Sequence, residues 1–346
     1  MQTLYYPDYG ELAIRHLPSP CIEHPSDVLL TVLACGICGS ELETFRSKSK
    51  RRAPPLIMGH EFCGIVSETG EAVTDFKKGD YVVSNSIISC NNFSYCEEGL
   101  INLCESRQVF GMHRNGAFAQ TVNVPSQCIL PLPGHMDYKA ACLIEPLANA
   151  VHILNMLAGF TRDPVNVLII GAGSMGLLIL QALKCLRQST IVVADINEER
   201  LRVADRLGAD YVVNSSKTAL PDFIDRFSGH RGMDVAIDAV GNAITTEYGL
   251  RIIKPGGVLV MMGLAENNSK LLSYDIVLRE KKIMGSYAAV RQDLETAVEL
   301  IGSGNIDVTS WVQYYSLAEG KKAFEDMLDA RYIKAVILPN VIQNYA

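Results

Sequence analysis

Two hydrophobic patterns divide the chain. Between Val28 and about Pro133, the apolar residues form short β-branched runs, such as Val28–Leu33 and Tyr81–Val83. Turn signals such as Asn115-Gly116 separate these runs. Short strands bounded by Gly, Asn and Asp are typical of a β-barrel or β-sandwich. This part of the chain therefore predicts a β-rich domain.

From Val165 onward, continuous apolar strands alternate with helical segments. The strand Val165–Ile170 leads through a glycine-rich turn into the helix Leu177–Leu186 and then the strand Thr190–Ala194. This alternation predicts βαβ units and a parallel sheet with helices on both faces. The alternation continues with helices over Glu198–Leu207, Leu220–Phe227 and Ile244–Ile253, and strands over Tyr211–Val213, Val235–Asp238 and Val258–Met262. The tail has a different pattern, which predicts helices over Leu294–Ile301 and Leu317–Met327 and a final strand over Ala335–Leu338.

Length and charge narrow the classes of protein that fit. A chain of 346 residues exceeds the usual size of one hydrophobic core, so we expect two domains. A net charge of −7 argues against a nucleic-acid or membrane-surface partner. The basic run Ser47–Arg52 is interpreted as a solvated loop, with attraction of a phosphorylated substrate as the alternative.

Cysteine content and hydropathy predict a cytoplasmic location. The chain has ten cysteines, which in a reducing compartment are metal ligands or buried thiols more often than disulfides. Its first residues lack the features of a secretory signal. No apolar run reaches the roughly 18 residues of a membrane span.

The turn after the strand Val165–Ile170 has the features of a dinucleotide site. Gly171, Gly173 and Gly176 follow a strand and open a helix, which allows a tight turn and close approach of the backbone to a pyrophosphate. Asp195 ends the next strand, where a carboxylate binds ribose hydroxyls and repels a 2′-phosphate. We therefore expect NAD rather than NADP. The alternatives are an ordinary turn for the glycines and a helix N-cap for Asp195.

Upstream residues have the ligand types of a zinc site. Cys38, the pair His60-Glu61 and Glu145 offer a thiolate, an imidazole and carboxylates. A catalytic Zn²⁺ takes three such protein ligands and keeps one position open. Taken singly, the cysteine would be read as a buried thiol and the histidine as a surface residue.

Together these motifs resemble the zinc-dependent medium-chain dehydrogenases over nearly the whole chain. The matching segments are Cys38-Gly-Ser40, Gly59-His-Glu-Phe62, Glu145-Pro-Leu147 and Gly171 to Gly176, and a Glu-Pro at the third position is similar to the polyol branch with its sorbitol, threonine and sugar-phosphate dehydrogenases. The resemblance implies a GroES-like catalytic zinc domain of residues 1–148 and 286–346. A Rossmann NAD-binding domain of residues 149–285 would be inserted into it.

The resemblance also implies roles for individual residues. Cys38 and His60 would be constant ligands of one catalytic zinc, completed by Glu61, by Glu145 or by each in turn. The zinc would act as a Lewis acid on the substrate oxygen, and Ser40 would take the alcohol proton. Glu43 stands where many members have the histidine that ends the proton relay; the alternative is a solvent-facing residue. The implied cofactor-binding residues are Gly171, Gly173, Ser174, Met175, Gly176, Asp195, Arg200 and Val240.

A second cysteine cluster resembles the family's structural zinc lobe, with one ligand missing. Cys90, Cys96 and Cys104 have the spacing of that lobe, but Phe93 replaces the second cysteine. Structural zinc is four-coordinate, so we expect the lobe to keep its shape without a stably bound zinc. The alternative is a fourth ligand from Glu97, Glu98 or Asn92.

The leading functional hypothesis is NAD-dependent oxidation of a secondary alcohol of a polyol, sugar or cyclitol. A sugar phosphate or sugar acid is the alternative substrate, and a non-catalytic nucleotide-sensing protein is the alternative class. Relatives place substrate contacts at positions that are here Phe45, Arg46, His113, Arg114 and Tyr287. The family implies a homodimer or homotetramer formed by edge strands, for which Val258–Met262 and Tyr274–Val277 are the candidates.

Overall fold

The computed structural model describes residues 1–134, 136–161, 165–269 and 271–340. These residues form two compact units. Unit 1 consists of Met1–Ala148 and the segment from Ala288 onward, and unit 2 is Asn149–Tyr287. The return to unit 1 lies two residues after the expected boundary at residue 286.

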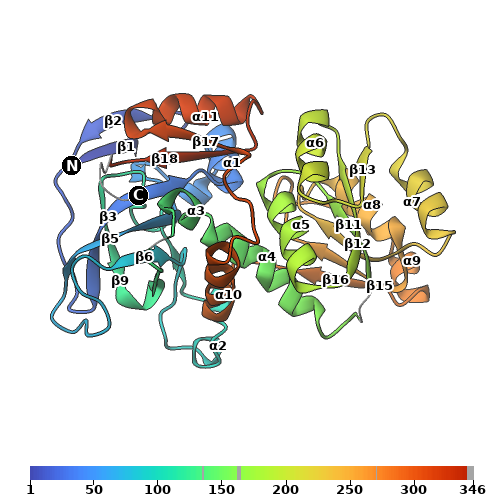
Figure 1. Cartoon of the computed structure of the whole chain (residues 1–346), viewed down its shortest axis with the longest axis horizontal. Coiled ribbons are helices and arrows are strands. Elements are labelled where there is room, and N and C mark those ends of the chain that lie inside the picture. The colour runs from blue at the N-terminus through green and yellow to red at the C-terminus, as the bar shows by residue number, and fades with distance from the viewer. Residues whose placement is uncertain (135, 162–164, 270, 341–346) are drawn as a thin grey trace. The chain divides into compact units, whose positions relative to one another are not determined.

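Unit 2 is built on a six-stranded sheet in the order β13-β12-β11-β14-β15-β16. Every neighbouring pair is parallel. This is the strand order of the doubly wound dinucleotide fold, and the expected fold class is confirmed. The strands are β11 (Val165–Ile170), β12 (Ser189–Asp195), β13 (Tyr211–Asn214), β14 (Met233–Asp238), β15 (Ile253–Met261) and β16 (Lys282–Gly285); the helices are α5 (Ser174–Leu186), α6 (Glu198–Arg206), α7 (Leu220–Ser228), α8 (Ala243–Ile252) and α9 (Ser273–Leu278) (Figure 1).

The prediction of the edge strand of this sheet was wrong. The segment Val258–Met262 falls largely in β15, which pairs with β14 on one side and β16 on the other. The edge strands are β13 and β16, and Tyr274–Val277 lies in helix α9 rather than in a strand. Strand β16 could not be predicted from the sequence because Lys282–Gly285 is short and only partly apolar.

Unit 1 is a mainly antiparallel β domain centred on β3 (Asp27–Gly36). β3 pairs with β5 (Glu61–Thr69), β9 (Thr121–Pro125) and β18 (Lys334–Leu338). The other strands are β1 (Gln2–Tyr6), β2 (Ala13–His16), β4 (Leu56–Ile57), β6 (Tyr81–Ser84), β7 (Ile87–Ile88), β8 (Gln108–Val109), β10 (Ile129–Pro131) and β17 (Val312–Ser316).

Helices in unit 1 carry or flank the residues singled out above. Helix α1 (Gly39–Ser47) begins directly after Cys38, and helix α4 (Ile144–Leu157) carries Glu145 in its first turn. The remaining helices are α2 (Ser94–Glu97), α3 (Tyr138–Ala141), α10 (Arg291–Gly302) and α11 (Gly320–Leu328), with 3₁₀ turns at Lys50–Arg52, Ile101–Leu103, Ser126–Cys128 and Leu317–Glu319 (Figure 1).

The pairing of β18 with β3 brings residues from the far end of the chain next to the end of β3, just before Cys38. Val336 lies opposite Gly36 and Ile337 opposite Cys35, in antiparallel register. The residue that opens β18, Lys334, therefore lies close to the carboxyl end of β3 although almost 300 residues separate them. No sequence pattern indicated this neighbour.

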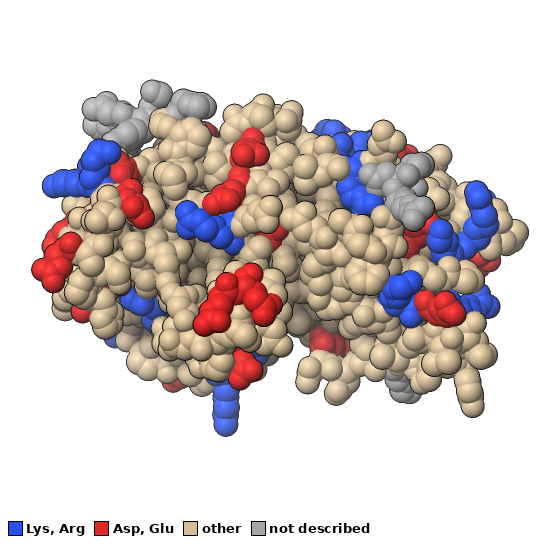
Figure 2. Space-filling model, turned by 90° about the horizontal axis from the view of Figure 1, so that it is seen from below, with Lys and Arg blue, Asp and Glu red and all other residues tan. Residues whose placement is uncertain are grey.

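None of the described helices is both long enough and apolar enough to cross a membrane. On the face shown in Figure 2, Lys and Arg side chains lie in small groups, several of them beside carboxylates.

Candidate active site

Three of the expected metal ligands converge in unit 1. The ligand atoms of Cys38, His60 and Glu61 all lie within 4.8 Å of one another. Strand pairing produces this convergence, because Gly36 near the end of β3 lies opposite Glu61 at the start of β5. A thiolate, an imidazole and a carboxylate are ligands that Zn²⁺ accepts in a catalytic site.

The carboxylate of Glu41 ties the two ligand segments together. Its Oε1 lies 3.0 Å from Nδ1 of His60 and accepts a hydrogen bond of 2.8 Å from the backbone N–H of Gly59. Its Oε2 accepts a hydrogen bond of 3.0 Å from the backbone N–H of Cys38. Because Nδ1 is engaged, Nε2 of His60 is the atom available to a metal. Burial opposes the charge on Glu41, but His60 outweighs it and lowers the pKa of this carboxyl.

Glu61 is held by a buried cation that the sequence reasoning missed. Lys334 donates from Nζ to Oε2 of Glu61 and, at 2.9 Å, to the carbonyl oxygen of Ile37. Both side chains are buried. Gly36 leaves room for this pair, because a Cβ at Gly36 would collide with Oε2 of Glu61. Burial lowers the pKa of Lys334, but Glu61, Cys38 and Cys142 nearby together raise it by more, so the ammonium form is favoured.

Glu145 lies outside this group of three. Among the described residues, the cluster of ligand atoms contains Glu61 and not Glu145. Glu145 is 3 % exposed and its carboxyl is hydrogen-bonded to Ser86. Burial raises the pKa of Glu145, and the nearby charge of Glu61 raises it further.

Helix α1 holds the two residues expected to move the proton. The hydroxyl of Ser40, in the first turn, donates to Sγ of Cys38 at 3.3 Å. The carbonyl of Ser40 accepts a hydrogen bond of 2.9 Å from the hydroxyl of Thr44. Glu43 follows about one turn later and is partly exposed.

Arg52 is the exception to the interpretation of the basic run Ser47–Arg52 as solvated, because the other residues of the run are exposed or partly exposed. Its side chain is fully buried. Nε donates to the carbonyl of Gly111 at 2.5 Å, and Nη1 donates to the carbonyl of Ser40 at 2.9 Å and to Oγ1 of Thr44 at 3.3 Å. The neighbouring Arg51 is exposed, as expected. The burial of Arg52 could not be predicted, because composition does not distinguish two adjacent arginines of which one is buried and the other exposed.

The glycine-rich turn in unit 2 has the geometry of a dinucleotide site. Gly171 has φ +101°, a conformation that favours glycine, and a Cβ at Gly176 would collide with the carbonyl oxygen of Gly171. Gly173 is the N-cap of α5 and has no side chain to cap the helix. The first backbone N–H groups of α5 therefore remain available to an anion such as a pyrophosphate.

The carboxylate of Asp195 lies beside this turn. Its Oδ2 accepts a hydrogen bond of 2.7 Å from the backbone N–H of Ala172, and its Oδ1 accepts one of 2.8 Å from Asn197. The N-cap of α6 is Asn197, so the alternative role of Asp195 as a helix cap is wrong.

The other residues expected to contact the cofactor lie around this turn or in the first turn of α6. Ser174 and Met175 form the partly exposed start of α5. A Cβ at Gly171 would meet the side chain of Val240 at 2.8 Å. Arg200 is in the first turn of α6, and its Nε is buried without a hydrogen-bond partner among the described residues.

Asp238 is a positioning residue that the sequence reasoning did not select. Its carboxylate accepts hydrogen bonds from the backbone of Val240 at 3.0 Å and Gly241 at 2.8 Å, and from the hydroxyls of Thr245 at 3.0 Å and Thr246 at 2.9 Å. A carboxylate that ends a buried parallel strand was the available signal.

Comparison with known proteins decides the family. Residues 24–134 match the alcohol dehydrogenase GroES-like domain and residues 174–303 match the zinc-binding dehydrogenase family. The chain is 32 % identical to the D-arabitol-phosphate dehydrogenase of Enterococcus avium, with 96 % of each chain covered. The chain belongs to the zinc-dependent medium-chain dehydrogenase superfamily. The expected family is thereby confirmed, and the protein is an oxidoreductase that acts on CH–OH groups.

Further relatives of this dehydrogenase use polyols and nicotinamide cofactors. It is 29 % identical to the sorbitol dehydrogenase of Bacillus subtilis, with 95 % of each chain covered. A Sinorhizobium meliloti 1021 dehydrogenase bound to NADP has a TM-score of 0.89 and 29 % identity, covering 98 % of this chain and 99 % of that one. An Escherichia coli CFT073 alcohol dehydrogenase complexed with NADH has a TM-score of 0.90 and 26 % identity at the same coverages. The cofactor of the family is thus a nicotinamide dinucleotide.

The expected substrate residues of the dehydrogenase have different environments. Phe45 packs in the core, with ring centroids 6.0 Å from Tyr6 and 5.7 Å from Phe324, which gives it a packing role. Arg46 is exposed at the last turn of α1. Tyr287 is partly buried at the end of unit 2.

His113 and Arg114 follow β8 in unit 1. Nδ1 of His113 accepts a hydrogen bond of 3.0 Å from the backbone of Val109, and partial burial, with Arg107 and Arg52 nearby, lowers the pKa of this histidine. The guanidinium of Arg114 lies 5.6 Å from the ring centroid of Phe110. The neutral form of His113 is therefore favoured.

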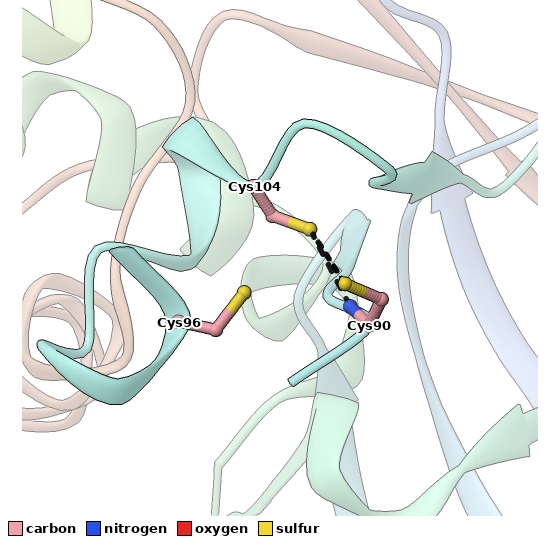
Figure 3. Close-up of side chains that lie close together, drawn as sticks. All are labelled: Cys90, Cys96 and Cys104. Atoms are coloured by element: carbon pink, nitrogen blue, oxygen red, sulfur yellow. Dashed lines mark hydrogen bonds between the residues drawn. The ribbon is translucent and has the colours of Figure 1, made fainter. Parts of the chain in front are cut away.

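The three-cysteine lobe of the dehydrogenase brings its thiols together. The Sγ atoms of Cys90, Cys96 and Cys104 lie within 4.8 Å of one another (Figure 3). Among the described residues, no carboxylate or imidazole joins this group. The alternative in which Glu97 or Glu98 completes the site is therefore not supported by the geometry, and both side chains are exposed.

Proposed function

We propose that this dehydrogenase transfers hydride between a secondary alcohol of a polyol, sugar or cyclitol and NAD, with one catalytic zinc per chain. The observation that carries the proposal is the convergence of Cys38, His60 and Glu61 within 4.8 Å. The glycine-rich turn with Asp195 beside it supports the cofactor assignment.

The donor set fits a catalytic zinc. We propose Cys38, His60 and Glu61 as the ligands. Glu61 is preferred to Glu145 because its carboxylate belongs to the cluster of ligand atoms and Lys334 engages only one of its oxygens. When bound, zinc polarises the alcohol oxygen of the substrate.

The proton leaves through residues of α1. In the proposal, the hydroxyl of Ser40 accepts the alcohol proton as it releases its own proton toward solvent, and hydrogen bonds from Thr44 and Arg52 to its carbonyl hold the backbone at this point. Glu43, about one turn further along the partly exposed face of α1, passes the proton to solvent.

NAD rather than NADP is the proposed acceptor. The carboxylate of Asp195 supports this preference because it would repel a 2′-phosphate and accept bonds from ribose hydroxyls. Comparable kcat/KM values with NAD⁺ and NADP⁺ would contradict the proposal. An Asp195→Asn variant should reduce the ratio of kcat/KM with NAD⁺ to kcat/KM with NADP⁺.

A sugar phosphate is the second candidate substrate. One support is Arg46, an exposed cation in the same helix as Ser40. The other is the Enterococcus avium relative, which is named for a phosphorylated polyol. With such a substrate, Arg46→Gln should raise KM about tenfold for the phosphate ester alone, the size of a lost charged hydrogen bond. Arg51→Gln is the matched control because Arg51 is also exposed.

NADH production from a panel of polyols, sugar phosphates, sugar acids and amino alcohols tests the function. Removing zinc by chelation should abolish NADH production, and zinc should restore it. Activity on no member of the panel, with NADH still bound tightly, would favour a nucleotide-sensing protein. Full activity in metal-free protein would reject the zinc mechanism.

A homodimer or homotetramer in the cytoplasm completes the proposal. Tyr274, Val277 and Leu278 of α9 are 85, 71 and 78 % exposed, and the edge strand β16 belongs to the same unit. Exposed apolar side chains beside a free strand edge favour pairing with a second copy. All ten cysteines are unpaired, which supports a reducing compartment.

A further inference from the structure

The lobe that connects β7 to β8 contains the three thiols that the catalytic proposal does not use. Cys90 follows β7, Cys96 lies in α2, and Cys104 follows the 3₁₀ turn Ile101–Leu103. The lobe is closed at its base by pairing of Ile87 with Val109. Its three ligand positions are therefore fixed by separate elements of one short segment.

The sulfur atoms occupy neighbouring positions. Sγ of Cys104 lies 3.4 Å from Sγ of Cys90 and accepts a hydrogen bond of 3.5 Å from the backbone N–H of Cys90. Sγ of Cys96 is turned toward the same space (Figure 3). Three sulfurs bound tetrahedrally at about 2.3 Å from one zinc would lie roughly 3.8 Å apart, which is close to this arrangement.

These residues do not fit the closed structural zinc of the family. Such a site has four protein ligands and no open position. Here the second position of the four-cysteine pattern is Phe93, whose ring has no donor atom, and among the described residues the cluster consists of three thiols alone. A cation bound here would keep a coordination position for water or a small external ligand.

We propose that Cys90, Cys96 and Cys104 form an exchangeable site for a soft divalent d¹⁰ cation such as Zn²⁺, separate from the catalytic ligands. Thiolates select such ions, and three of them suffice to bind one reversibly. An ion bound to the folded lobe also stabilises it by mass action, so occupancy would follow the supply of free metal.

Cadmium titration of the reduced zinc enzyme tests this site. Cd²⁺ bound to thiolates absorbs in the ultraviolet, so absorbance reports the number of Cd–S bonds. About one equivalent should bind without loss of the catalytic zinc, and EDTA should remove it within minutes. Cys96→Ser should lower the absorbance by about one third and weaken binding at least tenfold. Cys185→Ser, which removes an exposed thiol of unit 2, is the control and should change neither.

A second pair of variants tests the missing ligand. Phe93→Cys restores the four-cysteine pattern and should convert the exchangeable ion into a second zinc that resists EDTA. Phe93→Ser removes the ring without adding a thiol and should leave the ion exchangeable. The proposal is overturned if the parent enzyme develops no thiolate absorbance, if Cys96→Ser leaves that absorbance unchanged, or if the second ion of the parent already resists EDTA.

Discussion

At the scale of single residues, Glu61 depends on the absence of a side chain at Gly36. A Cβ there would meet Oε2 of Glu61 and lie 3.1 Å from Cε of Lys334. Both are ends of flexible side chains, so Gly36→Ala should displace the carboxylate and leave the fold intact. We expect zinc affinity to fall about 10- to 100-fold, as for other outer-shell changes, and kcat to fall with it.

Zinc content after dialysis and a thermal melt measure these two effects separately. Gly159→Ala is the control, because a Cβ at Gly159 meets nothing within 4 Å. Loss of cooperative unfolding in Gly36→Ala would show that the glycine supports the strand rather than the ligand.

Arg52 is expected to stabilise unit 1 although it carries charge in the interior. Replacing it by Met leaves the carbonyl of Gly111 without its buried donor and removes one of the two donors to the carbonyl of Ser40, the other being the hydroxyl of Thr44. We expect a loss of about 3 kcal/mol in unfolding free energy. Urea denaturation measures it, with Arg51→Met as the exposed control that should change stability by less than about 0.5 kcal/mol. Equal values for the two variants would contradict the buried role.

Cys128 gives a pH dependence with a definite sign. The thiol is buried, and burial raises its pKa to about 12. Above about pH 8.5 the unfolded chain loses this proton while the folded chain keeps it, so stability falls with rising pH, by up to about 1.4 kcal/mol per unit. Urea titrations from pH 8 to 10.5 should therefore show a shallower decline for Cys128→Ala. Cys21→Ala, which removes an exposed thiol, should keep the parent slope.

At the scale of elements, the turn before α5 contains two glycines with different tasks. A Cβ at Gly176 would strike the carbonyl of Gly171, whereas a Cβ at Gly173 meets nothing within 4 Å. Gly176→Ala should therefore lower the melting temperature by several degrees, since a core clash costs about 1–3 kcal/mol. Gly173→Ala should keep the melting temperature and weaken NADH binding, because the space it fills is the one a pyrophosphate approaches. Fluorescence titration with NADH and calorimetry distinguish the two outcomes.

At this scale, strands were predicted correctly from the sequence where burial on both faces makes the run of apolar residues continuous. β11, β12 and β14 are buried on both faces and read directly as apolar runs. Helix α1 was not predicted because Gly39, Ser40 and several charged residues interrupt its apolar periodicity. Its first turn is also held by the carboxylate of Glu41, which the sequence pattern does not reveal. The choice between Glu61 and Glu145 also lay beyond the sequence, since it rests on β3 pairing with β5 and on Lys334 from the far end of the chain.

At the scale of the whole molecule, assembly is expected to depend on α9. The double variant Tyr274→Glu and Leu278→Glu places two charges among exposed apolar side chains and should yield monomers. Light scattering after size-exclusion chromatography measures the mass. Leu186→Glu, at an apolar position that is 43 % exposed in α5, is the control and should keep the parent mass. An unchanged mass in the double variant would place the interface elsewhere.

The bonds of Glu41 have a kinetic consequence. One carboxylate joins the start of α1 to the segment Gly59-His60, so neither ligand segment can move far while those bonds hold. Release of the proposed catalytic zinc would then require local opening of both segments together, which would make it a rare fluctuation of the native state. Under native conditions, the rate at which isotopically labelled zinc replaces the resident ion would report the free energy of that opening.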